Sequence, residues 1–171
     1  MLPFLSEENY EMHMEYLRTL RLKYSIYKDD STSTKNRNKN DILRQNIKNI
    51  RNDKSASLLL EITLHDVFFN SFSDGRLFSS DFLVRSFGSE AGFLNQVFQR
   101  CMDLESGFLC VFTTEGGIHF GSSRESSLFL KYGIPNIAID LCEHAYFLDY
   151  GFDRERYLRS AISYLDASKL G

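Results

Sequence analysis

The chain of 171 residues has few cysteines and no long apolar run. The three cysteines are Cys101, Cys110 and Cys142, an odd number with no C-x-x-C spacing. This pattern argues against a disulfide framework, so we expect buried, reduced thiols that act as small apolar side chains. A functional thiol at Cys142 is the alternative.

No apolar run approaches the roughly eighteen residues of a membrane span, so we expect no membrane partner. The first residues contain acidic side chains by position 7 and no basic, apolar leader, which predicts no secretory signal. We therefore expect a cytoplasmic protein, with a mitochondrion or another organelle as the alternative. The sequence also lacks an internal repeat and a glycine-rich nucleotide-binding loop.

The net charge of −3 predicts no general affinity for nucleic acid or acidic membranes. Basic residues concentrate in residues 28–55, where eight basic and four acidic side chains give +4 and leave −7 for the rest of the chain. Because no aromatic residues are interleaved for base stacking, a solvated loop is the preferred interpretation. Contact with RNA or another anion is the alternative.

Two helices are predicted in the N-terminal half. Residues 6–27 place His13, Leu17 and Leu20 on one face, behind a capping Ser6. A lone histidine on such a face is more often a satisfied core residue than a ligand. A shorter helix is expected to begin at Asp41.

The second strong helix covers residues 56–72 and has Glu61 and His65 on its apolar face, one turn apart. Burial of a carboxylate is costly unless it is paired or protonated, so Glu61 is the most unexpected residue of the chain.

The C-terminal half predicts helices followed by strands. A turn at residues 73–76 precedes the first of these elements. We expect helices at 79–87 and 89–104, strands at 108–113, 118–120 and 135–140, and a closing helix at 153–168. His119 is interpreted as a strand residue and not as a ligand.

The third predicted strand ends at Asp140, four residues before His144. One turn of helix after the strand would place the carboxylate and the imidazole side by side. An oxygen and a nitrogen ligand suit a redox-active iron or manganese ion. Structural pairing of a histidine with a carboxylate is the commoner meaning of such a spacing.

Three motifs resemble those of the iron/manganese superoxide dismutases. The stretch DLCEHAYFLDY at 140–150 resembles that family's D-x-W-E-H-A-Y-Y-x-x-Y signature. LPF at 2–4 with SEENYEMH at 6–13 resembles its L-P-Y and S-x-E-T-x-x-x-H opening, and LHDVFFN at 64–70 resembles N-H-x-F-Y-W-N. The resemblance implies four metal ligands: His13, His65, Asp140 and His144.

The resemblance also implies an α+β fold, with an N-terminal helical hairpin at 1–73 and an α/β domain with a small three-stranded antiparallel sheet at 74–171. It implies one iron or manganese ion per subunit, which converts superoxide to dioxygen and hydrogen peroxide. Glu143 matches an interface glutamate that bonds a ligand histidine of the other subunit, so a homodimer through Glu143 and His144 is expected. Glu143 as an ordinary surface carboxylate is the alternative.

The residues around the implied site depart from the family pattern. Glu61 stands where iron-type members have a glutamine that donates to bound hydroxide. An ionised Glu61 can only accept and would favour the trivalent metal, a protonated one could imitate glutamine, and a direct ligand role is the third option. Arg21 occupies the place of the family's gateway tyrosine, and Tyr24 is a poor substitute because it lies about 60° around the helix. We expect Arg18 or Arg21 to steer anionic superoxide.

Other family positions differ as well. Leu17 replaces the gateway histidine, Phe147 replaces its tyrosine partner, and the absence of tryptophan leaves Phe69, Phe108 and Cys142 as the wall of the site. We therefore expect a dismutase of reduced activity. A partner-binding or metal-binding scaffold and other redox chemistry at the same metal are the alternatives.

Overall fold

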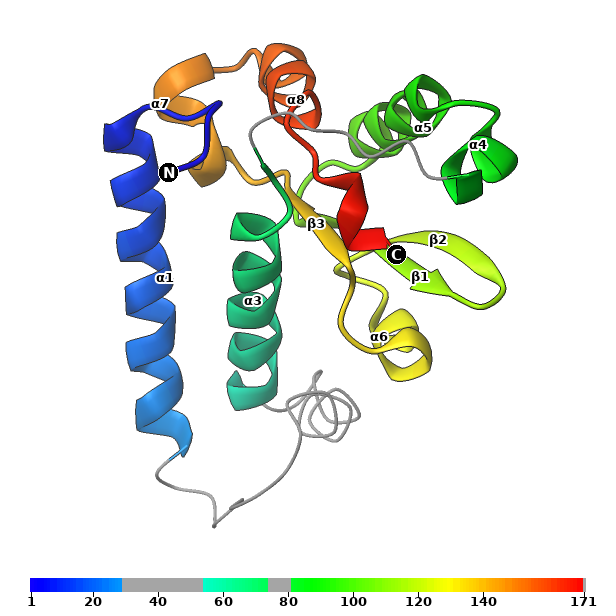
Figure 1. Cartoon of the computed structure of the whole chain (residues 1–171). Helices are drawn as coiled ribbons and strands as arrows, with labels where there is room; N and C mark the ends of the chain where they lie inside the picture. The colour runs from blue at the N-terminus through cyan, green and yellow to red at the C-terminus, as the bar shows by residue number, and fades with distance from the viewer. Residues whose placement is uncertain (29–53, 74–80, 171) are drawn as a thin grey trace.

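The computed structural model describes residues 1–28, 54–73 and 81–170 (Figure 1). The described helices and strands, in chain order, are α1 (Glu7–Lys28), α3 (Lys54–Phe69), α4 (Asp81–Phe87), α5 (Glu90–Asp103), β1 (Phe108–Thr114), β2 (Gly117–Ser122), α6 (Ser126–Tyr132), β3 (Ile137–Asp140), the 3-10 turn η1 (Glu143–Ala145), α7 (Phe147–Tyr150), α8 (Arg154–Ile162) and the 3-10 turn η2 (Ala167–Leu170).

Helices α1 and α3 form the predicted N-terminal pair and run side by side (Figure 1). The side chain of Ser6 caps α1 by accepting a hydrogen bond from the backbone N–H of Asn9 at 3.2 Å, as predicted. The buried face of α1 includes His13, Leu17 and Leu20. This face packs on α3.

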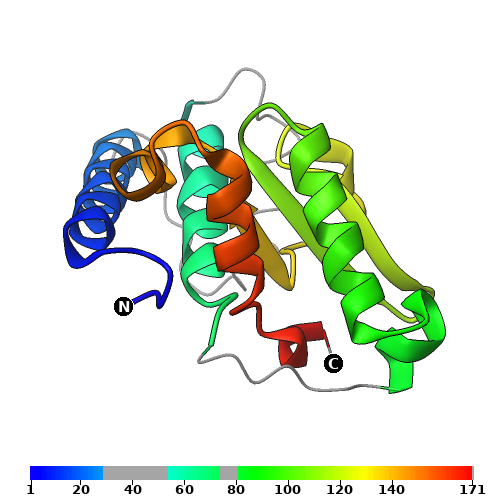
Figure 2. The same ribbon diagram turned by 90° about the horizontal axis from the view of Figure 1, so that it is seen from above.

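The sheet has the order β2-β1-β3, and both pairings are antiparallel, as expected. β1 is the central strand and its first five residues are buried. Helix α3 lies between α1 and the sheet in Figure 1, and the view from above in Figure 2 shows the same order. The register places Phe108 opposite Asp140, so the start of β1 and the end of β3 meet at the edge that faces the helix pair.

Two predicted helices are shorter than the sequence suggested, and both end for the same reason. α3 ends at Phe69 and α8 at Ile162, because the chain beyond each helix pairs with the other. Phe72 and Leu165 form an antiparallel bridge, flanked by hydrogen bonds of 2.9 Å from Ser73 N to the Tyr164 carbonyl and from Asp166 N to the Ser71 carbonyl. These tertiary hydrogen bonds replace the last helical turns.

Helix α6 was not predicted, whereas His119 does lie in β2, opposite Phe112. The helix expected from Asp41 and most of the turn expected at 73–76 lie outside the described residues. The division of the chain at residue 73 stays a prediction. Within the described residues, no helix combines the length and the apolar character that crossing a bilayer requires.

Candidate metal centre

The four implied ligands come from four separate elements and meet at one point. His13 belongs to α1, His65 to α3, Asp140 to the end of β3 and His144 to η1. Each offers one ligand atom, and these atoms all lie within 4.8 Å of one another. From Asp140 Oδ2, the Nε2 atoms of the three histidines lie at 3.4, 3.5 and 3.1 Å in chain order. We call these four residues the ligand cluster.

The backbone around Asp140 is held from both sides, which fixes the direction of its carboxylate. The Tyr157 hydroxyl donates a hydrogen bond of 2.8 Å to the Asp140 carbonyl. The backbone N–H of Cys142 donates to Asp140 Oδ1 at 2.9 Å, so Oδ2 is the oxygen that faces the histidines. His144 reaches the same oxygen from a 3-10 turn and not from the α-helical turn that the spacing suggested.

His65 is oriented by its own helix. Its Nδ1 lies 2.8 Å from the Glu61 carbonyl oxygen, which can only accept, so Nδ1 carries the proton and Nε2 is left with its lone pair. Histidine ligands of metal ions usually have this arrangement, in which the second nitrogen donates to a carbonyl or carboxylate.

Aromatic rings enclose the cluster on its inner side. The ring of Phe69 lies 5.0 Å from that of His13, and the ring of Phe108 lies 5.0 Å from that of His65. Phe68 packs on His13 at 5.3 Å. The expected wall of Phe69 and Phe108 is therefore in place, and it keeps the surroundings of the cluster apolar.

The pKa shifts of Asp140 and His65 favour the protonation states that bind a metal, whereas that of His144 favours the protonated ring. Burial by itself raises the pKa of Asp140, but the adjacent imidazoles of His13 and His144 outweigh it and hold that pKa well below its usual range. Burial lowers the pKa of His65, which favours the neutral imidazole. Burial also acts to lower the pKa of His144, yet the adjacent carboxylate of Asp140 raises it overall.

Three buried polar atoms of the cluster lack a hydrogen bond within the described part of the chain. They are Nδ1 and Nε2 of His13 and Oδ2 of Asp140. Nε2 and Oδ2 lie 3.4 Å apart but are not aligned for a hydrogen bond with each other. Buried polar atoms are normally satisfied. Three imidazole nitrogens and one carboxylate oxygen, with no thiolate, suit iron or manganese. The residues present thus fit the implied ion.

Tyr16 is a site residue that the sequence interpretation missed. Its hydroxyl donates a hydrogen bond of 2.6 Å to Glu61 Oε1, and its ring lies 4.5 Å from the ring of His144. Burial, and then the hydrogen bond to Glu61, raise the pKa of Tyr16 above its ordinary value, so the hydroxyl stays protonated. Its position three residues after His13 was the available signal, because i and i+3 lie on the same side of a helix.

Other residues named from the sequence lie around the cluster. Glu61 is not one of the four clustered ligands, which argues against its direct ligand role. The guanidinium of Arg21 donates to Asp66 at 2.6 Å, and Arg18 pairs with Glu15 at 2.9 Å. Both arginine side chains are at least half exposed.

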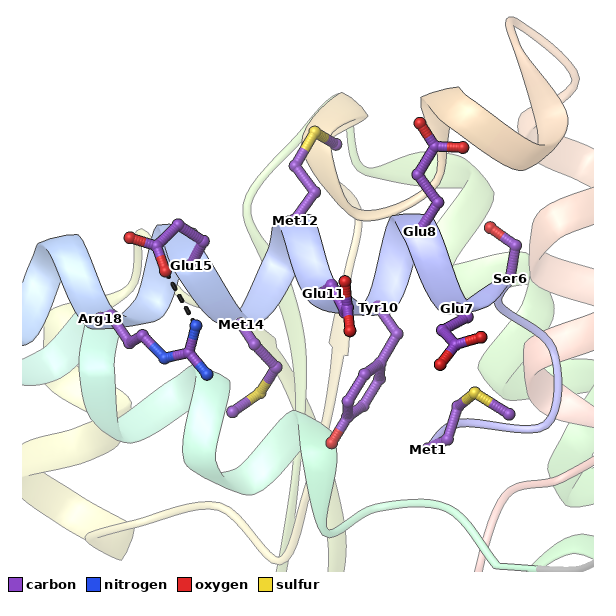
Figure 3. A pocket seen from close by; sticks show the side chains of 10 residues that line it. All are labelled: Met1, Ser6, Glu7, Glu8, Tyr10, Glu11, Met12, Met14, Glu15 and Arg18. Carbon is purple, nitrogen blue, oxygen red and sulfur yellow. Dashed lines mark hydrogen bonds and ion pairs between the residues drawn. The ribbon is translucent and has the colours of Figure 1, made fainter.

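A large hollow among the described residues lies away from the cluster. It measures about 1200 Å³ and follows the outer face of α1 and the N-terminus, where Glu7, Glu11 and Met14 are among the side chains that line it (Figure 3). A smaller groove of about 200 Å³ lies between α3 and the start of β1, and Glu61, Phe108 and Cys142 are part of its lining. The chemistry of the side chains, and not the size of the hollow, identifies the site.

Comparison with known proteins agrees with this geometry. A search of curated proteins found no match. Residues 79–170 match the family model described as iron/manganese superoxide dismutases, C-terminal domain. The match covers more than half of the chain and includes Asp140 and His144, which the structure joins to two histidines from the preceding helices. The chain therefore belongs to the iron/manganese superoxide dismutase family.

Proposed function

We propose that this protein is a superoxide dismutase that uses one iron or manganese ion per subunit, held by His13, His65, Asp140 and His144. The observation that supports this most is the convergence of four ligand atoms within 4.8 Å from four elements of the fold. When bound, the ion supplies one-electron redox chemistry by alternating between its trivalent and divalent states. One superoxide is oxidised to dioxygen, and a second takes up an electron and two protons to form hydrogen peroxide.

The residues of the chain orient the ion and control its surroundings. The Glu61 carbonyl holds the His65 ring in the tautomer that presents Nε2, and the Cys142 N–H directs the Asp140 carboxylate. Phe69 and Phe108 limit the access of water, which strengthens electrostatic effects at the site. Arg21 remains our candidate for attracting superoxide, since it is exposed and cationic, although Asp66 partly offsets its charge.

Assembly as a homodimer through Glu143 and His144 belongs to the same proposal. Glu143 is exposed, and Phe147, Leu148 and Phe152, which follow in the next ten residues, are exposed apolar side chains. Exposed apolar residues that are close together mark interaction surfaces. A two-fold axis here would bring Glu143 of each copy to His144 of the other. The location in the cytoplasm stays an expectation.

The test is a metal analysis and a superoxide decay assay on the same purified sample. We expect close to one iron or manganese ion per chain and a decay rate that rises in proportion to the metal content. Removal of the metal with a chelator should abolish the activity, and its return should restore it. Protein that holds no metal after loading with either ion would contradict the proposal.

A second candidate is a metal-binding or partner-binding scaffold with impaired catalysis. The carboxylate of Glu61, next to His65 and bonded to Tyr16, supports it, because a negative charge beside the ion favours the trivalent state. A metal-loaded sample without dismutase activity would favour this candidate.

A further inference from the structure

The ring of His13 is held differently from that of His65, although both side chains are fully buried. Nδ1 of His65 has the Glu61 carbonyl, one helical turn earlier, as its partner at 2.8 Å. Nδ1 of His13 makes no hydrogen bond within the described residues. An imidazole that ligates through Nε2 carries its proton on Nδ1, so this proton of His13 needs an acceptor.

Asn9 offers a buried acceptor one helical turn before His13. The residue is 0% exposed, and its Oδ1 also lacks a hydrogen bond in the part of the chain that the structure describes. The orientation of the amide follows from its partners, because Nδ2 donates to Asp149 Oδ2 at 3.0 Å and to the Ala145 carbonyl at 3.4 Å. A carboxylate and a carbonyl only accept, so the atom left without a partner is the oxygen.

The two unpaired atoms are complementary in chemistry. Residues four apart on a helix are neighbours on its surface, with about 6 Å between their Cβ atoms. Nδ1 of His13 is a donor in the tautomer that binds a metal, and Oδ1 of Asn9 can only accept. Because a buried donor and a buried acceptor are each costly when left unpaired, a hydrogen bond between them satisfies both.

We propose that Asn9 is a positioning residue for the metal centre, whose Oδ1 accepts the Nδ1 proton of His13 and so directs Nε2 toward the ion. The inference rests on the proposed metal-dependent function and names a residue outside the ligand cluster that supports it. The same amide joins two ligand-bearing segments, since its partners Ala145 and Asp149 follow His144 in the chain.

Zinc is a suitable probe because it takes imidazole and carboxylate ligands and is diamagnetic, so the ring protons stay visible by NMR. In the zinc-loaded full chain, the Nδ1 proton of His13 should exchange slowly with water. Asn9→Leu keeps the bulk and removes the amide, so exchange should become about tenfold faster, an order-of-magnitude estimate for one lost hydrogen bond. The affinity for manganese, measured by competition with a chelator, should fall about 10–100-fold, the usual cost of losing a group that supports a ligand.

An exchange of the two polar groups separates support of His13 from packing of α1. In the double variant Asn9→Asp with Asp149→Asn, a carboxylate oxygen at position 9 can accept from His13, and an amide at position 149 can donate to that carboxylate. This variant should keep the slow proton exchange and most of the manganese affinity. Asn95→Leu on α5 is the matched control, because Asn95 is exposed and lies outside the ligand cluster. Both readings should equal those of the unaltered protein.

Failure of this inference and failure of the proposed function give different results. An unaltered chain that binds neither iron nor manganese would contradict the proposed function. If the unaltered chain binds metal and Asn9→Leu leaves either the ring-proton exchange or the manganese affinity unchanged, the role of Asn9 is overturned.

The double variant decides the question where Asn9→Leu does not fold. Circular dichroism establishes that each variant is folded before its metal is measured. A folded double variant with fast exchange of the His13 proton and weak manganese binding would also overturn the inference, since the amide of Asn9 would then act only through its contacts with Ala145 and Asp149.

Discussion

The ligand cluster and the residues that surround it differ in how their polar atoms are satisfied. We define the outer ring as five residues that each contact a ligand: Tyr16, Glu61, Phe69, Phe108 and Cys142. In the cluster, three side chains are fully buried, and His13 Nε2 and Asp140 Oδ2 have no hydrogen bond within the described residues. In the outer ring, the polar side chains of Tyr16 and Glu61 satisfy each other.

The ligand cluster therefore requires a bound ion, whereas the outer ring changes only the surroundings of that ion. The cluster leaves buried polar atoms unpaired, which is costly unless an ion completes it. The outer ring is satisfied by protein contacts alone, so its residues could change without loss of the ion. The ligands match the family pattern at every position, while Glu61 and Cys142 do not.

The largest effect should follow removal of a ligand. His65→Ala leaves three ligand atoms and should lower metal affinity by more than the roughly 10–100-fold that loss of a supporting group costs. Elemental analysis after dialysis gives the metal content, and superoxide decay should fall with it. His119→Ala is the control, because His119 is a histidine in β2 outside the cluster. Full metal retention by His65→Ala would contradict the claim that the ligand cluster, unlike the outer ring, is required to hold the ion.

Packing behind the cluster can be tested apart from its metal chemistry. Phe68 is fully buried against His13, so Phe68→Ala should reduce the free energy of unfolding of the metal-free protein by about 3–5 kcal/mol. Urea denaturation followed by circular dichroism measures this change. Phe152→Ala removes a ring that is 87% exposed and should stay within about 0.5 kcal/mol of the unaltered protein. Similar losses in both variants would contradict the assigned core.

Within the outer ring, the charge of Glu61 should matter more than its bulk. Glu61→Gln should raise dismutase activity per bound metal ion several-fold, since an amide no longer favours the trivalent ion and can donate as well as accept. The measurement is superoxide decay normalised to metal content. Glu15→Gln removes a charge that α1 already pairs with Arg18 and should have no effect. Unchanged or lower activity in Glu61→Gln would count against an inhibitory charge.

The smallest effect concerns the thiol of the outer ring. Burial, and then the negative charge of Asp140, raise the pKa of Cys142 to about 12 from an ordinary value of 9.0. The folded chain therefore keeps a proton that the unfolded chain loses, so this thiol adds stability below pH 9 that is lost as the pH rises toward 12. Alkylation of Cys142 by iodoacetamide at pH 8 should be much slower in the folded protein than in urea.

Cys142→Ala provides the control for that measurement. It should remove the slow alkylation and make the free energy of unfolding fall less steeply with pH above 9, by up to about 1.4 kcal/mol per pH unit for one proton. Rapid alkylation of the folded chain would show that Cys142 is not held as a neutral thiol.

The sequence predicted the parts of the fold that depend on local pattern. The period of apolar residues predicted α1 and α3, and the apolar segments at 108–113 and 118–120 predicted the strands of the β1–β2 hairpin. The ends of α3 and α8 were wrong, because they depend on the bridge between Phe72 and Leu165, which pairs segments far apart in sequence.

The clustering of His13, His65, Asp140 and His144 could be predicted because each residue lies in a motif that resembles the family. The role of Tyr16 could not, since it depends on the direction of a side chain toward a residue of another helix. Tyr24 lies nearer in sequence to the family's gateway position than Tyr16 does, but Tyr16 is the tyrosine that contacts His144. A residue that takes over a family role from a different sequence position is not part of the family motif, so the motif cannot predict it.

The position of His13 on the first helix has a consequence for the life of the protein in a cell. α1 rests mainly on α3 and the η1 turn, and the ion would bind its middle to residues that follow more than a hundred positions later. Bound ligands stabilise whatever they hold together, and weakly held elements open first. We expect that α1 detaches from the rest of the fold when iron and manganese are scarce, and that proteases then cleave the chain. Its abundance would therefore follow the metal supply even at a constant rate of synthesis.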